Sequence, residues 1–159
     1  MSKGYFVTAT GTDVGKTFIT ALLVKKWRDS GIDAGYYKAA LSGAELRDGK
    51  WVAGDADYVK RIANLPDTQE QLVSYVYKEA VSPPAKKATA LGSINACVLT
   101  VEYARSCGLD VRGLIVNCYS SSGNLEMEDD NIRMMLDLTG LEILAKVKDG
   151  DTDLGVQPF

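Results

Sequence analysis

The sequence contains no histidine among its 159 residues, and it has only three cysteines and four prolines. The absence of histidine excludes serine–histidine triads, histidine metal ligands and histidine as a general acid or base. Cys97, Cys107 and Cys118 lack C-x-x-C spacing, which favours reduced thiols over disulfides or a metal site. Oxidative pairing between molecules is a weaker alternative. Any chemistry therefore depends on lysine, acidic and hydroxyl side chains, backbone amides and a metal ion.

Long apolar runs and clusters of positive charge are also missing. Hydrophobic residues make up 46% of the chain, charged residues 25%, and the formal net charge is −3, which is typical of a globular protein. There is no basic run for nucleic acid or an anionic membrane, no bilayer-spanning stretch and no signal-peptide pattern. We therefore expect a cytoplasmic protein that binds neither nucleic acid nor membrane, organised as a single domain over residues 1–159.

The most informative segment is Thr8-Ala9-Thr10-Gly11-Thr12-Asp13-Val14-Gly15-Lys16-Thr17, which follows the apolar Tyr5-Phe6-Val7. A strand, a loop of small residues and a Gly-Lys-Thr that opens a helix can surround a polyphosphate with backbone N–H groups. Lys16 would then reach the outer phosphates, and Thr17 would offer its hydroxyl to Mg²⁺. The strict motif has glycine at position 10, where this chain has threonine. The alternative is a strand–helix turn in which these residues serve only turn and cap geometry.

Strand-like segments alternate with helix-like segments along the chain. The predicted strands are 5–10, 34–39, 72–78, 113–119 and 142–147, and the predicted helices are 15–30, 55–63, 91–107 and 126–139. This alternation predicts an α/β fold with a mainly parallel sheet. The helix at 91–107 has no strand ahead of it. No apolar strand ends in the acidic residue that often helps P-loop enzymes hold Mg²⁺.

Four further residues are candidates for chemistry. Lys38 ends the second predicted strand, and strand carboxyl ends form the ligand crevice of a parallel sheet, so Lys38 would point toward the region of Lys16. Two lysines suit an acceptor that develops negative charge, although a solvated strand-end lysine is the plain alternative. Ser42 lies in the next loop. Asp55 is either a Mg²⁺ ligand or a helix cap. Asn117 either binds an adenine edge or forms a turn.

Six ordered blocks of the chain resemble the ATP-dependent dethiobiotin synthetase family, whose members have a three-layer P-loop NTPase-like fold. The blocks are residues 5–17, Gly35-Tyr36-Tyr37-Lys38 with Ser42-Gly43, Gly54-Asp55-Ala56, Ser82-Pro83, Leu91-Gly92-Ser93-Ile94-Asn95 and Gly113-Leu114-Ile115-Val116-Asn117. The resemblance implies a homodimeric cyclo-ligase of biotin biosynthesis that uses ATP and Mg²⁺ to form dethiobiotin from 7,8-diaminononanoate and CO₂. A substrate carbamate would attack the γ-phosphate of ATP, and the resulting carbamic–phosphoric anhydride would close to a cyclic urea.

The resemblance also implies roles for individual positions. The catalytic residues would be Lys16 and Lys38, and the Mg²⁺ ligands Thr17 and Asp55. The nucleotide would be held by Thr12, Asp13, Val14, Gly15, Lys16, Thr17 and Asn117. The substrate would be held by Thr12, Lys38, Ser42, Leu91, Gly92 and Asn95, of which the last three would bind its distant carboxylate near a dimer interface.

The chain departs from the family between residues 84 and 90, where the family has a long stretch with a strand and a further acidic Mg²⁺ ligand. Either the complete enzyme contains residues that are absent from this sequence, or the protein is truly shortened. The first is favoured, because loss of interior strands from a parallel sheet exposes apolar faces and unpaired edges. The alternative function is a non-catalytic or shortened P-loop nucleotide-binding module. A partition-type or cell-division-type ATPase fits less well, since residues 10–14 contain no lysine.

Overall fold

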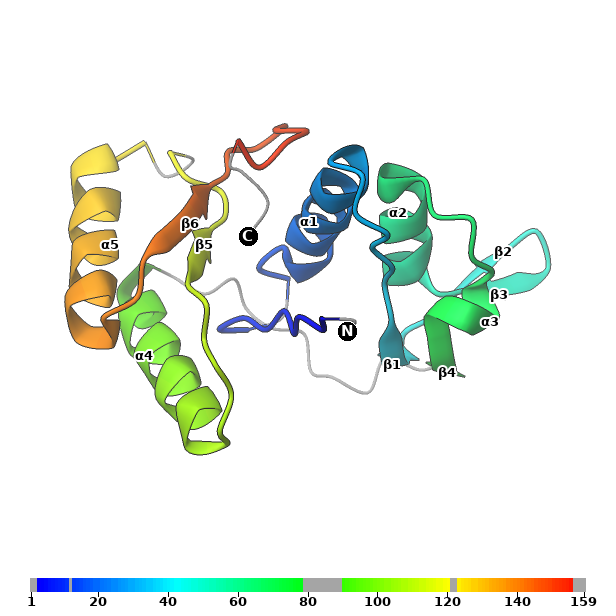
Figure 1. Cartoon of the computed structure of the whole chain (residues 1–159), viewed down its shortest axis with the longest axis horizontal. Coiled ribbons are helices and arrows are strands. Elements are labelled where there is room, and N and C mark those ends of the chain that lie inside the picture. The colour runs from blue at the N-terminus through cyan, green and yellow to red at the C-terminus, as the bar shows by residue number, and fades with distance from the viewer. Residues whose placement is uncertain (1–2, 12, 79–89, 121–122, 156–159) are drawn as a thin grey trace. The chain divides into compact units, whose positions relative to one another are not determined.

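The computed structural model describes residues 3–11, 13–78, 90–120 and 123–155, with residues 90–93 described by their backbone alone (Figure 1). The described residues belong to two compact units. Unit 1 is drawn from Met1–Lys16 and Lys86–Val156, and unit 2 from Thr17–Ala85 with Gln157–Phe159. The division falls inside the predicted phosphate loop, so Lys16 belongs to unit 1 and Thr17 to unit 2.

Helices alternate with short, mostly parallel strands, which confirms the predicted α/β class. The helices are α1 (Lys16–Asp29), α2 (Gly54–Ala63), α3 (Gln69–Leu72), α4 (Ala90–Ser106) and α5 (Leu125–Thr139). The strands are β1 (Lys38–Ser42), β2 (Glu45–Arg47), β3 (Lys50–Val52), β4 (Val73–Tyr77), β5 (Leu114–Val116) and β6 (Ile143–Lys146). Within the described ranges, no helix combines the length and apolar character needed to cross a membrane.

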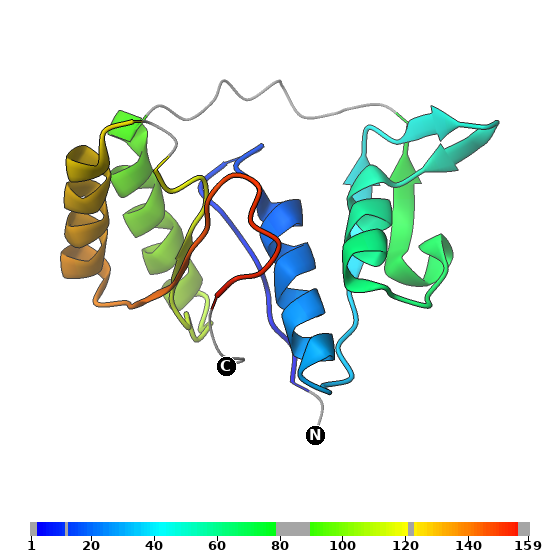
Figure 2. The ribbon, with the colours of Figure 1, turned by 90° about the horizontal axis from the view of Figure 1, so that it is seen from above.

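Unit 2 is built on the parallel pair β1–β4, in which Lys38 lies opposite Val73 and Ser42 opposite Tyr77. The antiparallel hairpin β2–β3 follows β1 and extends away from this pair (Figure 2). Small and branched apolar side chains from the helices and from β1 and β4 form one buried cluster. Its members are Ala21, Val24, Leu41, Ala44, Ala53, Ala56, Val59, Ala63, Leu65, Leu72 and Val73. This cluster packs α1, β1 and α2 together within unit 2.

Helix α2 carries Asp55, the predicted acidic ligand of Mg²⁺. The Ala53 backbone N–H, just before the helix, donates to Gln69 Oε1 at 2.7 Å, which joins the start of α2 to α3. Asp55 and Asp57 occupy the first turn, where the helix dipole favours carboxylates. Asn64 ends the helix in the left-handed conformation, with φ of 51°. The buried face of α2 thus anchors Asp55, whose side chain is partly exposed in the first turn.

Unit 1 contains the parallel pair β5–β6 and two helices that pack against each other, α4 and α5 (Figure 1). Arg105 Nη2, near the end of α4, donates to the Thr139 carbonyl oxygen at the end of α5 at 2.8 Å. Asn124 caps α5 by accepting the Met127 backbone N–H at 3.1 Å. Gly140 ends that helix with φ of 66°.

The structure differs from the fold expected from the sequence in four respects. The predicted strand 5–10 takes part in none of the described β-ladders, and Phe6 is 81% exposed; a strand needs a hydrogen-bonded partner, which this segment lacks among the described strands. The strand predicted at 34–39 begins at Lys38 instead. The hairpin β2–β3 was not predicted, although its Asp48-Gly49 turn, with φ values of 48° and 76°, has the sequence that such turns favour. The described strands form separate pairs and not one continuous sheet.

Candidate functional site

The part of the phosphate loop in unit 1 turns sharply before α1. Asp13 and Gly15 both have positive φ, at 57° and 90°, and the Lys16 ammonium donates to the Gly11 carbonyl oxygen. Lys16 is therefore folded back over the loop that it would share with a phosphate ligand. Thr12, which we expected to contact both nucleotide and substrate, lies outside the described residues.

Asn117 packs directly against this loop. It follows β5, and its amide Nδ2 donates to the Val14 carbonyl oxygen at 3.2 Å. A Cβ atom placed on Gly15 would lie only 2.2 Å from the same Nδ2 atom. A side chain at position 15 is thus disfavoured by the left-handed backbone and could be accommodated only if the Asn117 amide shifted. From the sequence, Asn117 is expected either to bind an adenine edge or to form a turn, and no sequence pattern predicts this contact with the loop.

In unit 2, Asp55 brings together the candidate residues of three elements. The Thr17 hydroxyl, at the start of α1, donates to Asp55 Oδ1 at 2.7 Å. The Lys38 ammonium, at the start of β1, donates to Asp55 Oδ2 and forms an ion pair with it. The side chains of Lys38 and Asp55 remain 35% and 34% exposed, so the pair faces solvent or a ligand. Thr17, Lys38 and Asp55 are called the Asp55 cluster below.

Tyr36 is a neighbour of the Asp55 cluster that the sequence analysis did not single out. Burial, and then the negative charge of Asp55, raise the pKa of Tyr36 from 10.0 to about 12. Its side chain is partly buried against the core of unit 2. The available signal was its position two residues before Lys38, which is the spacing of one strand face. Tyr36 therefore remains a neutral phenol at neutral pH, near enough to Asp55 for the carboxylate charge to raise its pKa.

The remaining predicted substrate residues lie in different places. Ser42 is exposed at the carboxyl end of β1, on the same strand face as Lys38 because the two lie four positions apart. Asn95 is exposed on α4 in unit 1. Leu91 and Gly92 belong to the first turn of α4, and their surroundings lie outside the described residues. Ser42 thus belongs to unit 2, and Leu91, Gly92 and Asn95 belong to unit 1.

The donor atoms of the Asp55 cluster fit Mg²⁺. The Thr17 hydroxyl and Asp55 Oδ1 are adjacent hard oxygen ligands, and Mg²⁺ is commonly held by one or two carboxylates together with phosphate oxygens and waters. In the part of the chain that the structure describes, no three acidic or cysteine side chains gather closely enough to hold a metal by themselves. A metal here would therefore depend on a phosphate ligand for much of its coordination.

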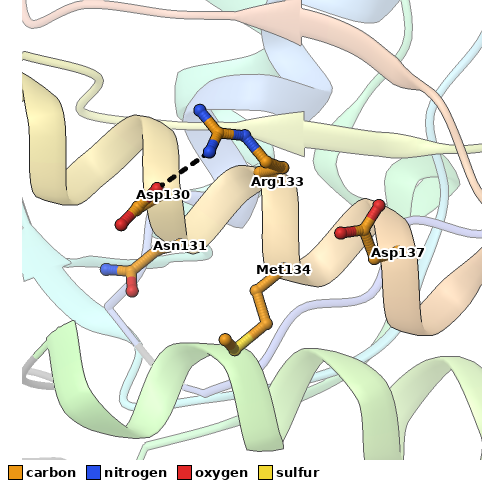
Figure 3. Close-up of a pocket in the computed structure, with 5 residues that line it drawn as sticks. All are labelled: Asp130, Asn131, Arg133, Met134 and Asp137. Carbon is orange, nitrogen blue, oxygen red and sulfur yellow. Dashed lines mark hydrogen bonds and ion pairs between the residues drawn. The ribbon is translucent and has the colours of Figure 1, made fainter.

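A pocket of about 300 Å³ lies elsewhere, on the surface of α5 (Figure 3). Its lining residues come from this one helix and are Asp130, Asn131, Arg133, Met134 and Asp137. Arg133 Nη1 donates to Asp130 Oδ1 at 3.2 Å, and Met134 is 52% exposed. The polar groups of the pocket are thus already paired or solvated, and we assign it no part in the site.

Comparison with known proteins identifies relatives of the chain. The AAA_26 family, described as an AAA domain, matches residues 3–90. A protein of Clostridium botulinum (strain ATCC 19397 / Type A) is 59% identical over 83 residues, which cover 52% of this chain and 37% of that protein. A protein of C. botulinum (strain Eklund 17B / Type B) is 35% identical over 205 residues, covering 90% of this chain and 89% of that protein. One of Brachyspira hyodysenteriae is 34% identical over 214 residues, covering 94% of both chains.

Each of these three relatives is named ATP-dependent dethiobiotin synthetase BioD. The match to the first spans little more than a third of its length. The two longer alignments, of 205 and 214 residues, exceed the 159 residues of this chain, so these relatives contain residues that have no counterpart here.

Proposed function

Because the chain belongs to the dethiobiotin synthetase family, we propose that the protein is an ATP- and Mg²⁺-dependent cyclo-ligase of biotin biosynthesis. Its substrates are 7,8-diaminononanoate and CO₂, and its product is dethiobiotin. The observation that carries the proposal is the meeting of Thr17 and Lys38 on the two oxygens of Asp55. Such a cluster offers a metal ligand and a cation side by side, as a phosphoryl-transfer site requires.

The phosphate loop is the proposed nucleotide site. Lys16 supplies positive charge to the outer phosphates of ATP, and the backbone from Asp13 to Gly15 turns around them. The proposed nucleotide-binding residues are Thr12, Asp13, Val14, Gly15, Lys16, Thr17 and Asn117. The proposal is supported by the sharp turn of the loop and by the strain that a side chain at Gly15 would cause.

Asp55 divides its two oxygens between two partners. Oδ1 faces the Thr17 hydroxyl, and this pair is the proposed Mg²⁺ site; bound Mg²⁺ would neutralise negative charge on the phosphates. Oδ2 faces Lys38, which is therefore held beside the metal ligands without displacing Thr17. A cation in that position stabilises the negative charge that a carbamate and a transferred phosphoryl group share in the transition state.

The reaction needs no protein nucleophile, which suits a chain without histidine. The substrate carbamate oxygen attacks the γ-phosphate of ATP, ADP leaves, and the second amine then displaces phosphate as the ring closes. Lys16 and Lys38 are the proposed catalytic residues, acting through charge and position. Lys38 and Ser42, together with Thr12, bind the carbamate, while Leu91, Gly92 and Asn95 bind the distant carboxylate. We propose that the working enzyme is a cytoplasmic homodimer.

Product formation tests this function directly. The protein is incubated with ATP, Mg²⁺, bicarbonate and 7,8-diaminononanoate, and dethiobiotin and phosphate are measured together. We expect Lys38→Met to reduce turnover by about 100-fold or more, as loss of one transition-state donor does in other enzymes. Lys50→Met, a lysine exchange on the exposed hairpin strand β3 of the same unit, is the matched control and should keep wild-type turnover. A folded protein that binds ATP but forms no dethiobiotin would reject the proposal.

A second candidate function is a nucleotide-binding module without catalysis. It is favoured by the lone carboxylate of the Asp55 cluster and by the longer alignments, whose relatives contain residues without a counterpart in this chain. Such a module would bind ATP with measurable heat but release no phosphate, whether or not the diamine is present. Turnover by a chain whose intact mass matches 17.2 kDa would exclude it.

A further inference from the structure

The amide of Asn117 lies where it can control the shape of the phosphate loop. Nδ2 donates to the Val14 carbonyl oxygen at 3.2 Å and lies against the bare Cα of Gly15, although 103 residues separate Asn117 from Val14. We propose that Asn117 is a positioning residue that holds the loop in its phosphate-binding conformation. The identity of the ligand, a polyphosphate, rests on the proposed function. The contact of Asn117 with the loop does not depend on that function.

The turn that carries Asn117 has an unusual backbone. Cys118 and Ser120, which follow it, have positive φ values of 57° and 67°. Non-glycine residues adopt this conformation rarely, and they keep it where surrounding contacts outweigh the strain. Here the Tyr119 backbone N–H donates to the Val147 carbonyl oxygen at 2.9 Å, and the Ser120 N–H donates to Glu128 Oε2 at 2.6 Å. The turn is therefore tied to both β6 and α5.

The side chain of Tyr119 adds a second layer of support. Its hydroxyl donates to Asp129 Oδ1 at 3.0 Å, and Lys146 Nζ donates to the same oxygen at 2.8 Å. Lys146 Nζ also lies 4.3 Å from the centre of the Tyr119 ring, within the range of a cation–π contact. Two strand ends and one helix thus fix the turn from which Asn117 reaches Val14.

A positioning role and a base-reading role make different predictions. An asparagine amide has separate donor and acceptor atoms, so Nδ2 can hold Val14 while Oδ1 stays able to accept from a base. Loss of the loop contact must weaken the binding of any polyphosphate, whether or not it carries a base. Loss of a hydrogen bond to the base alone must weaken only the binding of the nucleotide.

The first experiment compares ATP with inorganic tripolyphosphate, both with Mg²⁺, by calorimetric titration of the full chain. We expect Asn117→Ala to lower the affinity for both ligands by about fivefold, which is the usual effect of losing one neutral hydrogen bond. Asn131→Ala, on α5 of the same unit, is the control and should change neither affinity. A weakening of ATP alone, with tripolyphosphate unchanged, would overturn the positioning role.

The second experiment tests whether Asn117 and Gly15 are coupled. In the wild-type background, Gly15→Ala should lower the affinity for tripolyphosphate by about 30-fold. The new Cβ adds backbone strain and also collides with Asn117 Nδ2. In the Asn117→Ala background that contact is gone, so the penalty should be at least about threefold smaller. Equal penalties in the two backgrounds would contradict the proposed contact.

The third experiment needs no ligand and separates this inference from the proposed function. Hydrogen exchange of the nucleotide-free protein is measured over residues 11–17 in wild type, Asn117→Ala and Asn131→Ala. Faster exchange in this segment for Asn117→Ala alone, with the rest of unit 1 unchanged, supports the positioning role. Unchanged exchange there would refute it. If the wild-type protein binds neither ligand, the proposed function fails, and hydrogen exchange still decides the role of Asn117.

Discussion

Replacing Asp55 with asparagine separates the part that this carboxylate plays in folding from the part that it plays in binding. Asparagine has nearly the same shape, and its carbonyl oxygen can still accept the Thr17 hydroxyl. The negative charge that pairs with Lys38 is lost. The same change removes a charge that helps to raise the pKa of Tyr36.

The expected effect on folding is small. The side chains of Lys38 and Asp55 are each about a third exposed, at 35% and 34%, and solvent-screened ion pairs contribute about 0–1 kcal/mol. A carboxylate in the first turn of a helix adds about 0.3–1 kcal/mol. We therefore expect Asp55→Asn to lower the free energy of unfolding by about 1 kcal/mol, measured by urea denaturation.

The expected effect on Mg²⁺-dependent binding is much larger. Residues that merely support a metal ligand commonly change metal affinity by about 10- to 100-fold, so loss of the ligand itself should weaken MgATP by about 100-fold or more. Calorimetric titrations with Mg²⁺ and with EDTA separate the metal-dependent part of the affinity. Asp57→Asn is the matched control, because Asp57 lies on the same helix turn but pairs with Arg47 at 2.9 Å.

Tyr36 provides an internal check on the same variant. Its pKa, about 12 in the wild type, should fall when the charge of Asp55 is removed, yet stay above 10.0 because burial is the larger cause. An alkaline titration of the tyrosine rings by nuclear magnetic resonance measures this change. The reasoning is refuted if Asp57→Asn lowers the affinity for MgATP as much as Asp55→Asn does, or if the loss of affinity in Asp55→Asn persists in EDTA. It is also refuted if Asp55→Asn changes the free energy of unfolding by several kcal/mol.

Three further predictions concern stability. Val59 is fully buried, so Val59→Ala should cost about 2 kcal/mol in urea denaturation; a cost below about 0.5 kcal/mol would contradict the described core. The hydrogen bond from Lys146 lowers the pKa of Asp129, so its stabilising effect is present above the unfolded-state pKa of about 4 and is lost as pH falls through the folded value. Lys146→Met should therefore differ from wild type in thermal midpoint at pH 7, and this difference should shrink in acid; a constant difference would rule out the linkage. Arg105→Ala should cost about 1 kcal/mol by removing the bond to Thr139, whereas unchanged stability would show that this link between α4 and α5 contributes nothing.

Local patterns account for the parts of the fold that the sequence predicted well. The observed bounds of α1, α2 and β4 agree with the predicted bounds to within about one residue. The signals that predict them, apolar periodicity and a glycine or asparagine at a helix end, are local in the sequence. The segment 5–10 has equally suitable residues and yet forms no strand. Its hydrogen bonds depend on a neighbouring strand, which is a property of other parts of the chain. The single-domain organisation of residues 1–159 stays a prediction.

The candidate site divides in the same way. The chemistry of Lys16, Thr17, Lys38 and Asp55 is a property of their side chains and of the short motifs in which they stand, so the sequence alone determined which residues to consider. Their partners are a different matter. That Asp55 joins Thr17 to Lys38, and that Asn117 reaches Val14 across 103 residues, was decided only by the tertiary structure. Contacts between distant residues depend on how the elements pack, and no local pattern encodes that packing.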